Sequence, residues 1–291
     1  MDFQLTDDQR ALRDGMRQLL HGRFALRDAT DRLDRELWRE LGKAGFFSLA
    51  LPEAAGGVGL GLPEAVLVFE EAGRVLLPGP AVASFLAAGV VPGAATGETV
   101  VTEVDGSLVP WLAEADVVRG DATGAVPLRS VDPLTPLHRV PVPTAGHPAA
   151  RAAQEAREAP AVLLYAAEQL GSATRSCETA VQHARRREQF GRPIGAFQAV
   201  KHLCAQMLVR AELARGAVYA AAVTGDALDA TAAKLLADDA AVRNARDCLQ
   251  VHGGMGFTWE SEVHLHLKRA WVRAELGRSA RDAEEELAAA L

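Results

Sequence analysis

An arginine-rich helix end followed by a glycine turn is the stretch best equipped for chemistry. It reads RRREQFGRPIGAFQ over residues 185–198. A guanidinium group matches phosphate oxygens in a two-pronged fork, and a nearby aromatic ring and amide can pack against and hydrogen-bond a nucleotide. Arginines at the C-terminal end of a helix are also favoured by the helix dipole, and glycine and proline can simply turn the chain. The pattern indicates either a pyrophosphate site or an ordinary helix end.

A second stretch with possible chemistry is QVHGGMGFTWE at residues 250–260. Three glycines in four residues let backbone N–H groups approach an anion closely, although glycine pairs between helices are usually plain turns. His264 and His266 lie two apart on an expected helix and so on different faces, which argues against a shared metal ion. We interpret both histidines as solvated or interface residues and the acidic run at 282–286 as an exposed helix face.

Composition and charge exclude several classes of protein. The 291 residues carry 31 Lys and Arg against 38 Asp and Glu, whereas nucleic-acid-binding proteins usually have a basic surplus. Patterns such as Walker A, HExxH, GxSxG and a GxGxxG after a strand are absent. An acidic start and the lack of about 18 consecutive apolar residues argue against a signal peptide or a membrane span. Cysteines 177, 204 and 248 have neither disulfide-framework nor zinc-type spacing, so we expect a reduced, cytoplasmic chain without metal, nucleic-acid or membrane partners.

The N-terminal region, residues 1–90, is expected to be all-helical. A capping-box pattern from Thr6 to Gln9 predicts the start of its first helix, because the two side chains can satisfy free backbone N–H groups reciprocally. A glycine-rich loop follows at 51–61, and Pro63 then suits the first turn of a helix that runs to about Arg74.

The other two regions differ sharply in composition. Residues 91–150 contain recurrent prolines, which remove ladder donors and confine strands to short pieces, so a reduced β or irregular insert is expected. Residues 151–291 return to long Ala- and Leu-rich stretches and predict a bundle of four or five helices. The β-prone runs of the insert are 98–104, 107–111, 124–130 and 138–142, and the breaks in the bundle are 191–195, 225 and 253–256.

Three blocks of the sequence resemble the acyl-CoA dehydrogenases, flavoproteins that oxidise the Cα–Cβ bond of acyl-CoA thioesters. The blocks are residues 1–20, residues 37–80, and the pair RREQFGRPIGAFQAVKH and QVHGGMGFTWE with the helices between them. The resemblance implies a mainly α fold with an N-terminal helical domain, a small reduced β insert and a C-terminal four-helix bundle. It also implies FAD as the cofactor.

The resemblance assigns roles to individual residues of the two motifs. In this family the Arg-x-x-Phe-Gly turn and the Gln-x-x-Gly-Gly segment of a neighbouring subunit close over the pyrophosphate and adenosine of FAD. The implied cofactor-binding residues are Arg187 at the pyrophosphate, Gln189, Phe190 and Gln198 along the adenosine, and Gln250, Gly253 and Gly254 from across the dimer interface.

The central region and the catalytic base depart from the family pattern. The family's larger β domain carries a Thr-Glu-Pro-type segment beside the flavin ring, of which residues 101–104 are at best a remnant. Abstraction of the α-proton requires a carboxylate beside Cα while flavin takes the β-hydride. The two positions from which the family supplies that glutamate read Gly277 and 161–162 here, and neither is acidic. The nearest carboxylates are Glu158, Glu168 and Glu275, of which Glu275 is kept as a candidate base.

These departures lead to three hypotheses. In the first, the chain is the base-less subunit of an α2β2 heterotetramer that dehydrogenates an acyl-CoA of lipid or steroid metabolism with FAD, and a second acyl-CoA dehydrogenase subunit supplies the base. In the second, the chain is a self-sufficient homo-oligomeric acyl-CoA dehydrogenase with an unrecognised glutamate. In the third, it is a non-redox scaffold or acyl-binding subunit. The family implies an electron-transfer flavoprotein or similar acceptor as a further partner.

Overall fold

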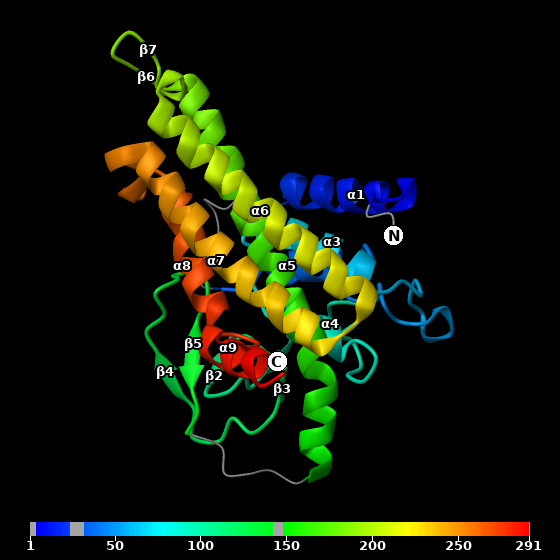
Figure 1. Cartoon of the computed structure of the whole chain (residues 1–291). Coiled ribbons are helices and arrows are strands. Elements are labelled where there is room, and N and C mark those ends of the chain that lie inside the picture. Colours follow the sequence, from blue (N-terminus) through cyan, green and yellow to red (C-terminus); the bar gives the residue numbers. More distant parts are fainter. Residues whose placement is uncertain (1–3, 24–31, 142–147, 291) are drawn as a thin grey trace.

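The protein, seen here as a computed structural model, is described over residues 4–23, 32–141 and 148–290, with only the backbone described at 23 and at 148–157. It is 61% helix and 8% strand, which confirms the expected mainly α fold. Helices α1 (Asp7–Arg23), α2 (Arg35–Lys43), α3 (Leu62–Arg74) and α4 (Ala81–Ala87) come first, with a short 3₁₀ turn, η2 (Glu53–Ala55), between α2 and α3. Figure 1 shows them packed around the middle of a long helical bundle.

The N-terminal helices begin where the sequence predicts. The Thr6 N–H donates to Oε1 of Gln9 at 3.0 Å and the Gln9 N–H donates to Oγ1 of Thr6 at 3.2 Å, so the predicted capping box is present. Asp34 caps α2 by accepting from two backbone N–H groups. Helix α3 carries Pro63 in its first turn and ends at Arg74, as expected.

The central region contains five three-residue strands between residues 101 and 139. β1 (Val101–Glu103) pairs in parallel with β3 (Val117–Arg119), and β5 (Leu137–Arg139) lies antiparallel between β2 (Leu108–Pro110) and β4 (Val126–Leu128). β1, β2 and β4 fall within the predicted β-prone runs, and β5 begins one residue before the fourth run, whose last residue lies outside the described residues. β3 was not predicted. The insert is small, as the prolines require.

The C-terminal part is built on one long helix, α5 (Pro148–Arg186), which packs against α3, α6 and α7. A hairpin of β6 (Glu188–Gln189) and β7 (Arg192–Pro193) and a short turn, η3 (Ile194–Ala196), lead into α6 (Gln198–Thr224). Helix α7 (Ala227–His252), turn η4 (Gly253–Phe257), α8 (Val263–Ala274) and α9 (Ala280–Ala289) follow. The helices therefore break at the predicted glycines, and Gly225 ends α6 with a φ of +66°.

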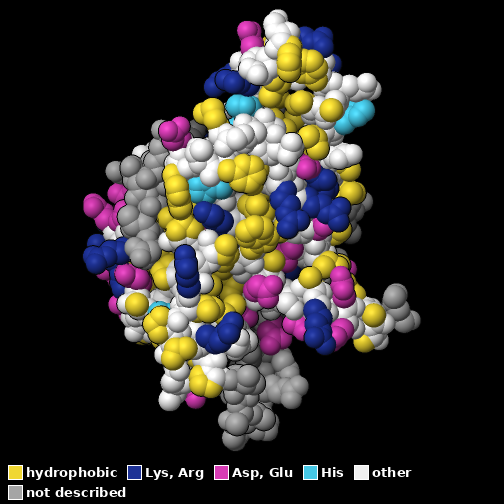
Figure 2. Space-filling view, turned by 90° about the vertical axis from the view of Figure 1, so that its left-hand side faces the viewer, with side chains coloured by type: hydrophobic (Ala, Val, Ile, Leu, Met, Phe, Trp, Pro, Cys, Tyr) yellow, Lys and Arg dark blue, Asp and Glu magenta, His cyan; other side chains and the backbone are white. Residues whose placement is uncertain are grey.

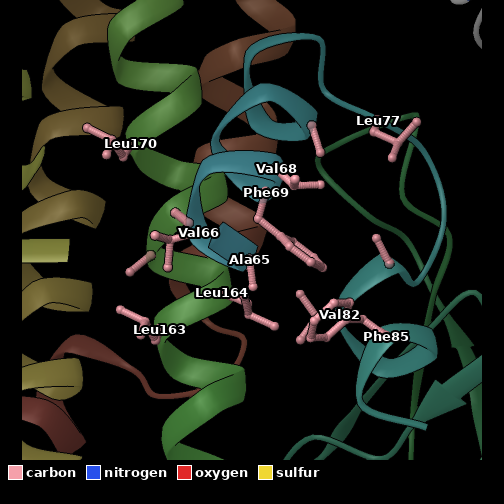
Figure 3. Close-up of a cluster of buried hydrophobic side chains, with 14 of the residues drawn as sticks. Ala65, Val66, Val68, Phe69, Leu77, Val82, Phe85, Leu163, Leu164 and Leu170 are labelled. Carbon is pink, nitrogen blue, oxygen red and sulfur yellow. The ribbon is translucent and has the colours of Figure 1, made fainter. Parts of the chain in front are cut away.

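The core joins the N-terminal helices to this bundle. Figure 3 shows Phe69 of α3 directed toward Val82 and Phe85 of α4 and Leu164 of α5. Two glycines allow α3 and α5 to cross closely. A Cβ on Gly73 would lie 2.0 Å from the carbonyl oxygen of Glu168. The reciprocal contact involves Gly171, whose Cβ would lie 1.9 Å from a carbonyl oxygen of α3, so side chains at either position would force the helices apart.

The interpretation of the histidines as solvated or interface residues was wrong. His264 and His266 are both buried in α8, at 7% exposure each. Nδ1 of His266 lies 2.8 Å from the Ser172 hydroxyl, and burial together with nearby arginines lowers its pKa to about 3. Helix α8 packs against several elements at once, so opposite faces are both covered. The acidic run on α9 is mostly exposed, as expected, although Glu286 contacts Arg278 at 3.1 Å.

Among the described residues, no helix is long and apolar enough to cross a membrane. Within the same ranges, His, Cys, Asp and Glu side chains form no group of three or more that could hold a metal ion. The three cysteines are free thiols in the bundle.

Candidate functional site

The first motif forms a tip that projects beyond the end of the bundle (Figure 1). We call residues 187–198 the arginine tip. The Arg187 N–H continues α5 by donating to the His183 carbonyl, and the Arg187 carbonyl accepts from the Ile194 N–H, each at 2.8 Å. The chain reverses at Phe190 and Gly191, whose φ values are +55° and +75°. A left-handed conformation at a phenylalanine is strained, so the hairpin presents this side chain outward at a cost.

Aromatic and basic groups are concentrated on the tip. Phe190 is 91% exposed and meets Phe197 edge-on at 5.9 Å between ring centroids. The Arg192 guanidinium lies 4.4 Å from the centroid of the Phe197 ring. The side chain of Gln189 donates to the Glu188 carbonyl at 2.8 Å, and the Gln198 amide lies 3.5 Å from the His202 ring. Both amides are therefore on the surface and able to turn to a ligand.

The second motif lies at the same end of the helical bundle as the arginine tip. Gln250 is exposed in the last turn of α7, and Gly253 follows with a φ of +63°. A Cβ on Gly253 or Gly254 would meet nothing within 4 Å, so their backbone is open to an incoming group. The His183 and His252 rings stack at 4.0 Å between centroids and hold the ends of α5 and α7 together. Burial, the His252 ring and Arg187 lower the pKa of His183.

The chemistry of these residues fits a flavin dinucleotide. Among the described residues Arg187 and Arg192 form no salt bridge, and two arginines against Glu188 leave the tip with a net positive charge suited to a pyrophosphate. Exposed aromatic rings and amides beside that charge suit an adenosine. The face in Figure 2 shows hydrophobic side chains at the projecting end and below it, with Lys and Arg among them. The structure thus places all seven residues singled out from the sequence at the same end of the bundle, four on the arginine tip and three at the end of α7 and the start of η4.

A cavity of about 440 Å³ lies at the other end of α5, between α4, the β1–β2 turn, α5 and the loop that joins α8 to α9. Ala161 and Gly277, the residues at the two expected base positions, both line it. The residues from 161 to 186 span about 38 Å of helix at 1.5 Å per residue. This distance exceeds the length of an extended FAD. A cofactor held by the arginine tip therefore cannot also occupy the cavity of the same chain.

Carboxylates surround the cavity even though neither expected position supplies one. Glu158 lies 3.3 Å from Arg278, and Glu275 is exposed at the rim. Glu168 lies outside this cavity, 2.9 Å from Arg273. The acidic residues of the lining are Glu103, Asp105, Glu158, Glu275 and Asp282.

Sequence reasoning missed one of these carboxylates. Oδ2 of Asp105 accepts a hydrogen bond of 2.6 Å from the backbone N–H of Gly277. Burial raises the pKa of Asp105, while the Gly277 N–H and the Lys234 ammonium lower it. The available signal was its place two residues after the Thr-Glu pair at 102–103, but 172 positions separate Asp105 from Gly277.

Comparisons with known sequences identify both helical regions. Profiles of the acyl-CoA dehydrogenase N-terminal domain and C-terminal domain match residues 6–98 and 160–280. IpdE2 of Mycobacterium tuberculosis, named an acyl-CoA dehydrogenase, is 36% identical over 274 residues, which cover 87% of this chain and 86% of IpdE2. FadE34 of the same organism, with the same family name, is 36% identical over 278 residues and 81% of this chain. The chain spans only 39% of the length of FadE34.

Solved structures share the fold over nearly the whole chain. The ChsE4-ChsE5 complex from Mycobacterium tuberculosis gives a TM-score of 0.85 at 24% identity and covers 99% of this chain and 98% of that one. A variant of the steroid ACAD Tcur3481-Tcur3483 gives 0.81 at 25% identity, with 97% of each chain covered. Butyryl-CoA dehydrogenase from Megasphaera elsdenii gives 0.86 at 20% identity and covers 100% and 99%.

Proposed function

The chain belongs to the acyl-CoA dehydrogenase family, and we propose that it takes part in FAD-dependent α,β-dehydrogenation of an acyl-CoA as one subunit of an α2β2 heterotetramer. A second acyl-CoA dehydrogenase subunit carries the family's catalytic glutamate. One observation carries the proposal: Gly277 and Ala161 line the same cavity without a carboxylate of their own, while the arginine tip is retained at the opposite end of α5.

The arginine tip acts on the flavin of the neighbouring subunit. Arg187 binds the pyrophosphate, and Gln189, Phe190 and Gln198 contact the adenosine side. Gln250, Gly253 and Gly254 add an amide and open backbone N–H groups beside it. When bound, FAD accepts the hydride that leaves Cβ. The role of this chain is therefore to hold and orient a cofactor whose reactive ring lies in a cavity of another chain.

An exposed apolar face on α6 supports assembly. Leu208, Val209 and Leu213 are 54%, 57% and 62% exposed and lie on one side of the helix. A monomer rarely exposes several large apolar side chains together, so this face suits a subunit interface. The tip and the cavity of one chain are about 38 Å apart along α5. Assembly allows the arginine tip of one chain to lie beside the cavity of another.

The comparisons support the paired assembly and its substrate class. IpdE2 matches the chain over almost its full length, so the short central region also occurs in a named acyl-CoA dehydrogenase. The solved structures include the two-component ChsE4-ChsE5 complex and a steroid ACAD. We place the acyl group of the substrate in lipid or steroid metabolism on this basis, with an electron-transfer flavoprotein or similar protein as the electron acceptor.

Co-expression tests the proposal. The chain is purified alone and together with an acyl-CoA dehydrogenase subunit encoded beside it, and each sample is measured by absorbance and by light scattering. We expect stoichiometric flavin and the mass of an α2β2 complex only in the co-expressed sample. A lone chain that is yellow, forms a homotetramer and dehydrogenates an acyl-CoA refutes the paired assembly. A colourless complex that retains its function refutes the role in redox chemistry.

A further inference from the structure

The chain's own cavity remains without a role in the paired assembly, although it contains a carboxylate that is hydrogen-bonded to Gly277, one of the two expected base positions. We infer that Asp105 is a proton acceptor for the α-carbon of an acyl thioester bound in this cavity. The inference rests on the proposed function in one respect, because it takes an acyl thioester as the ligand. It adds a second proton-abstracting cavity to the assembly, different in construction from that of the partner.

The backbone holds Asp105 firmly in place. The Asp105 N–H donates to the Leu108 carbonyl and the Leu108 N–H donates to the Asp105 carbonyl, each at 2.8 Å, which closes the turn between β1 and β2. From this turn Oδ2 reaches the Gly277 N–H at 2.6 Å. No hydrogen bond to Oδ1 is found among the described residues, so this oxygen is the one available to a ligand. The side chain is half-buried and lines the cavity.

The loop that anchors Asp105 is fixed from its other side. Lys234, which is fully buried, donates through Nζ to the Arg273 carbonyl at 3.1 Å and to the Arg278 carbonyl at 3.5 Å. The same ammonium pairs with Asp238. These bonds of Lys234 hold the loop so that the Gly277 N–H stays directed at Asp105, which limits the motion of the carboxylate, as a proton acceptor requires.

The surroundings of Asp105 also suit proton abstraction. Burial raises the pKa of its carboxyl, and the nearby Glu103 and Glu158 raise it further, against the lowering effects of Gly277 and Lys234. A carboxylate with a raised pKa is a stronger base, and catalytic carboxylates are tuned in the same way by burial and like charges.

The other carboxylates of the lining are less suited. Glu158 is paired with Arg278, and Asp282 accepts a hydrogen bond of 2.7 Å from the Ser279 hydroxyl. Glu103 lies 3.8 Å from Arg119. Glu275 is exposed to solvent at the rim of the cavity, so a substrate can enter past it without displacing packed side chains. Asp105 is the carboxylate that is hydrogen-bonded to Gly277, one of the two expected base positions.

The chemical step balances without a redox partner. The α-C–H bond of the thioester breaks, its proton forms an O–H bond with Asp105, and the electron pair stays on the thioester as an enolate. In the absence of flavin the enolate takes a proton back, so the net result in heavy water is exchange of hydrogen for deuterium at Cα.

Exchange into phenylacetyl-CoA in D2O, followed by mass spectrometry, tests the inference on the purified chain alone. This thioester has an acidified α-carbon and no hydrogen on a saturated β-carbon, so it cannot be dehydrogenated. We expect exchange above the buffer rate, at least a tenfold loss in Asp105→Asn, and retention in Glu275→Gln. Asp121→Asn, on an exposed loop of the same central region, is the matched control. Asparagine keeps an oxygen that can accept from Gly277, and circular dichroism verifies the fold of each variant.

Wild-type exchange no faster than buffer overturns the inference, as does an unchanged rate in Asp105→Asn or a loss confined to Glu275→Gln. These results are separable from failure of the proposed function. Exchange needs neither flavin nor a partner, whereas the proposed function fails on flavin content and on the mass of the complex.

Discussion

The buried ion pair between Arg269 of α8 and Asp132 gives a quantitative prediction for the Arg269→Met variant. Arg269 is 3% exposed and Asp132 1% exposed. The guanidinium donates to Asp132, to the carbonyls of Leu76 and Leu77 at 3.2 and 3.1 Å, and to the Leu134 carbonyl at 3.2 Å. It therefore ties the central region and the α3–α4 connection to the bundle.

Removal of one partner of such a pair leaves a buried charge without compensation, which costs about 3–5 kcal/mol. For a chain of this size the loss corresponds to a fall in Tm of about 6–10 °C, at about 2 °C per kcal/mol. Methionine fills most of the vacated volume, so the loss reports the charge rather than a cavity. We therefore expect Arg269→Met to lower the free energy of unfolding by about 3–5 kcal/mol at neutral pH.

The pH dependence follows from Asp132. Burial alone raises the pKa of this carboxyl, but Arg269 and hydrogen bonds from Thr135 and the Leu134 N–H hold it below its ordinary value. A lowered folded-state pKa contributes stability that is present above the unfolded-state pKa of about 3.9 and is lost as pH falls through the folded-state value. In Arg269→Met, burial raises the pKa of Asp132, and protonation of Asp132 then removes the uncompensated buried charge. The difference in stability from wild type should thus shrink between pH 7 and pH 4.

Urea denaturation at both pH values measures this difference. Adding Asp132→Asn to Arg269→Met removes the stranded charge and should recover most of the loss. Arg281→Met, which removes an exposed i,i+4 pair with Glu285, is the control and should leave the midpoint nearly unchanged. A pH-independent loss in Arg269→Met, or a double variant no more stable than the single one, would refute the reasoning.

Three further predictions concern single sites. Gly277→Glu should lower stability by about 1–3 kcal/mol in thermal melts and should not confer dehydrogenation on the lone chain, because φ is +74° and a Cβ would lie 2.8 Å from the Tyr165 ring. Asp105→Asn should raise Tm at neutral pH but not below about pH 4, because a raised folded-state pKa contributes stability at low pH that is lost as pH rises through it. Gly171→Ala should cost about 1–3 kcal/mol, since its Cβ would meet a carbonyl oxygen of α3, whereas Gly15→Ala, in open space on α1, should stabilise by about 0.5–1 kcal/mol.

The sequence was sufficient for the features that local rules govern. The capping box at Thr6, the break at Gly225 and the short strands among prolines depend on neighbouring residues, and all are present. The sequence also singled out the arginine tip, because its residues are consecutive and their spacing resembles a family pattern, and its role at a flavin stays a proposal.

Features created by packing could not be predicted in this way. The burial of His264 and His266 depends on what covers each face of α8, which helical spacing does not reveal. β3 consists of three residues and is a strand only because it pairs with β1. Asp105 and Gly277 are brought together only when the central region docks on the α8–α9 loop, so no local pattern marks their contact.

The flavin content of the assembled complex tests the central claim most directly. The chain is co-purified with its partner as wild type, as Arg187→Ala and as Arg186→Ala, a neighbouring exposed arginine at the end of the same helix. Flavin per complex is measured by absorbance, and assembly is verified by light scattering. If Arg187 holds the pyrophosphate of a flavin that serves the partner's cavity, Arg187→Ala assembles but loses most of its flavin, whereas Arg186→Ala keeps it. Full flavin content in an assembled Arg187→Ala complex would contradict the account.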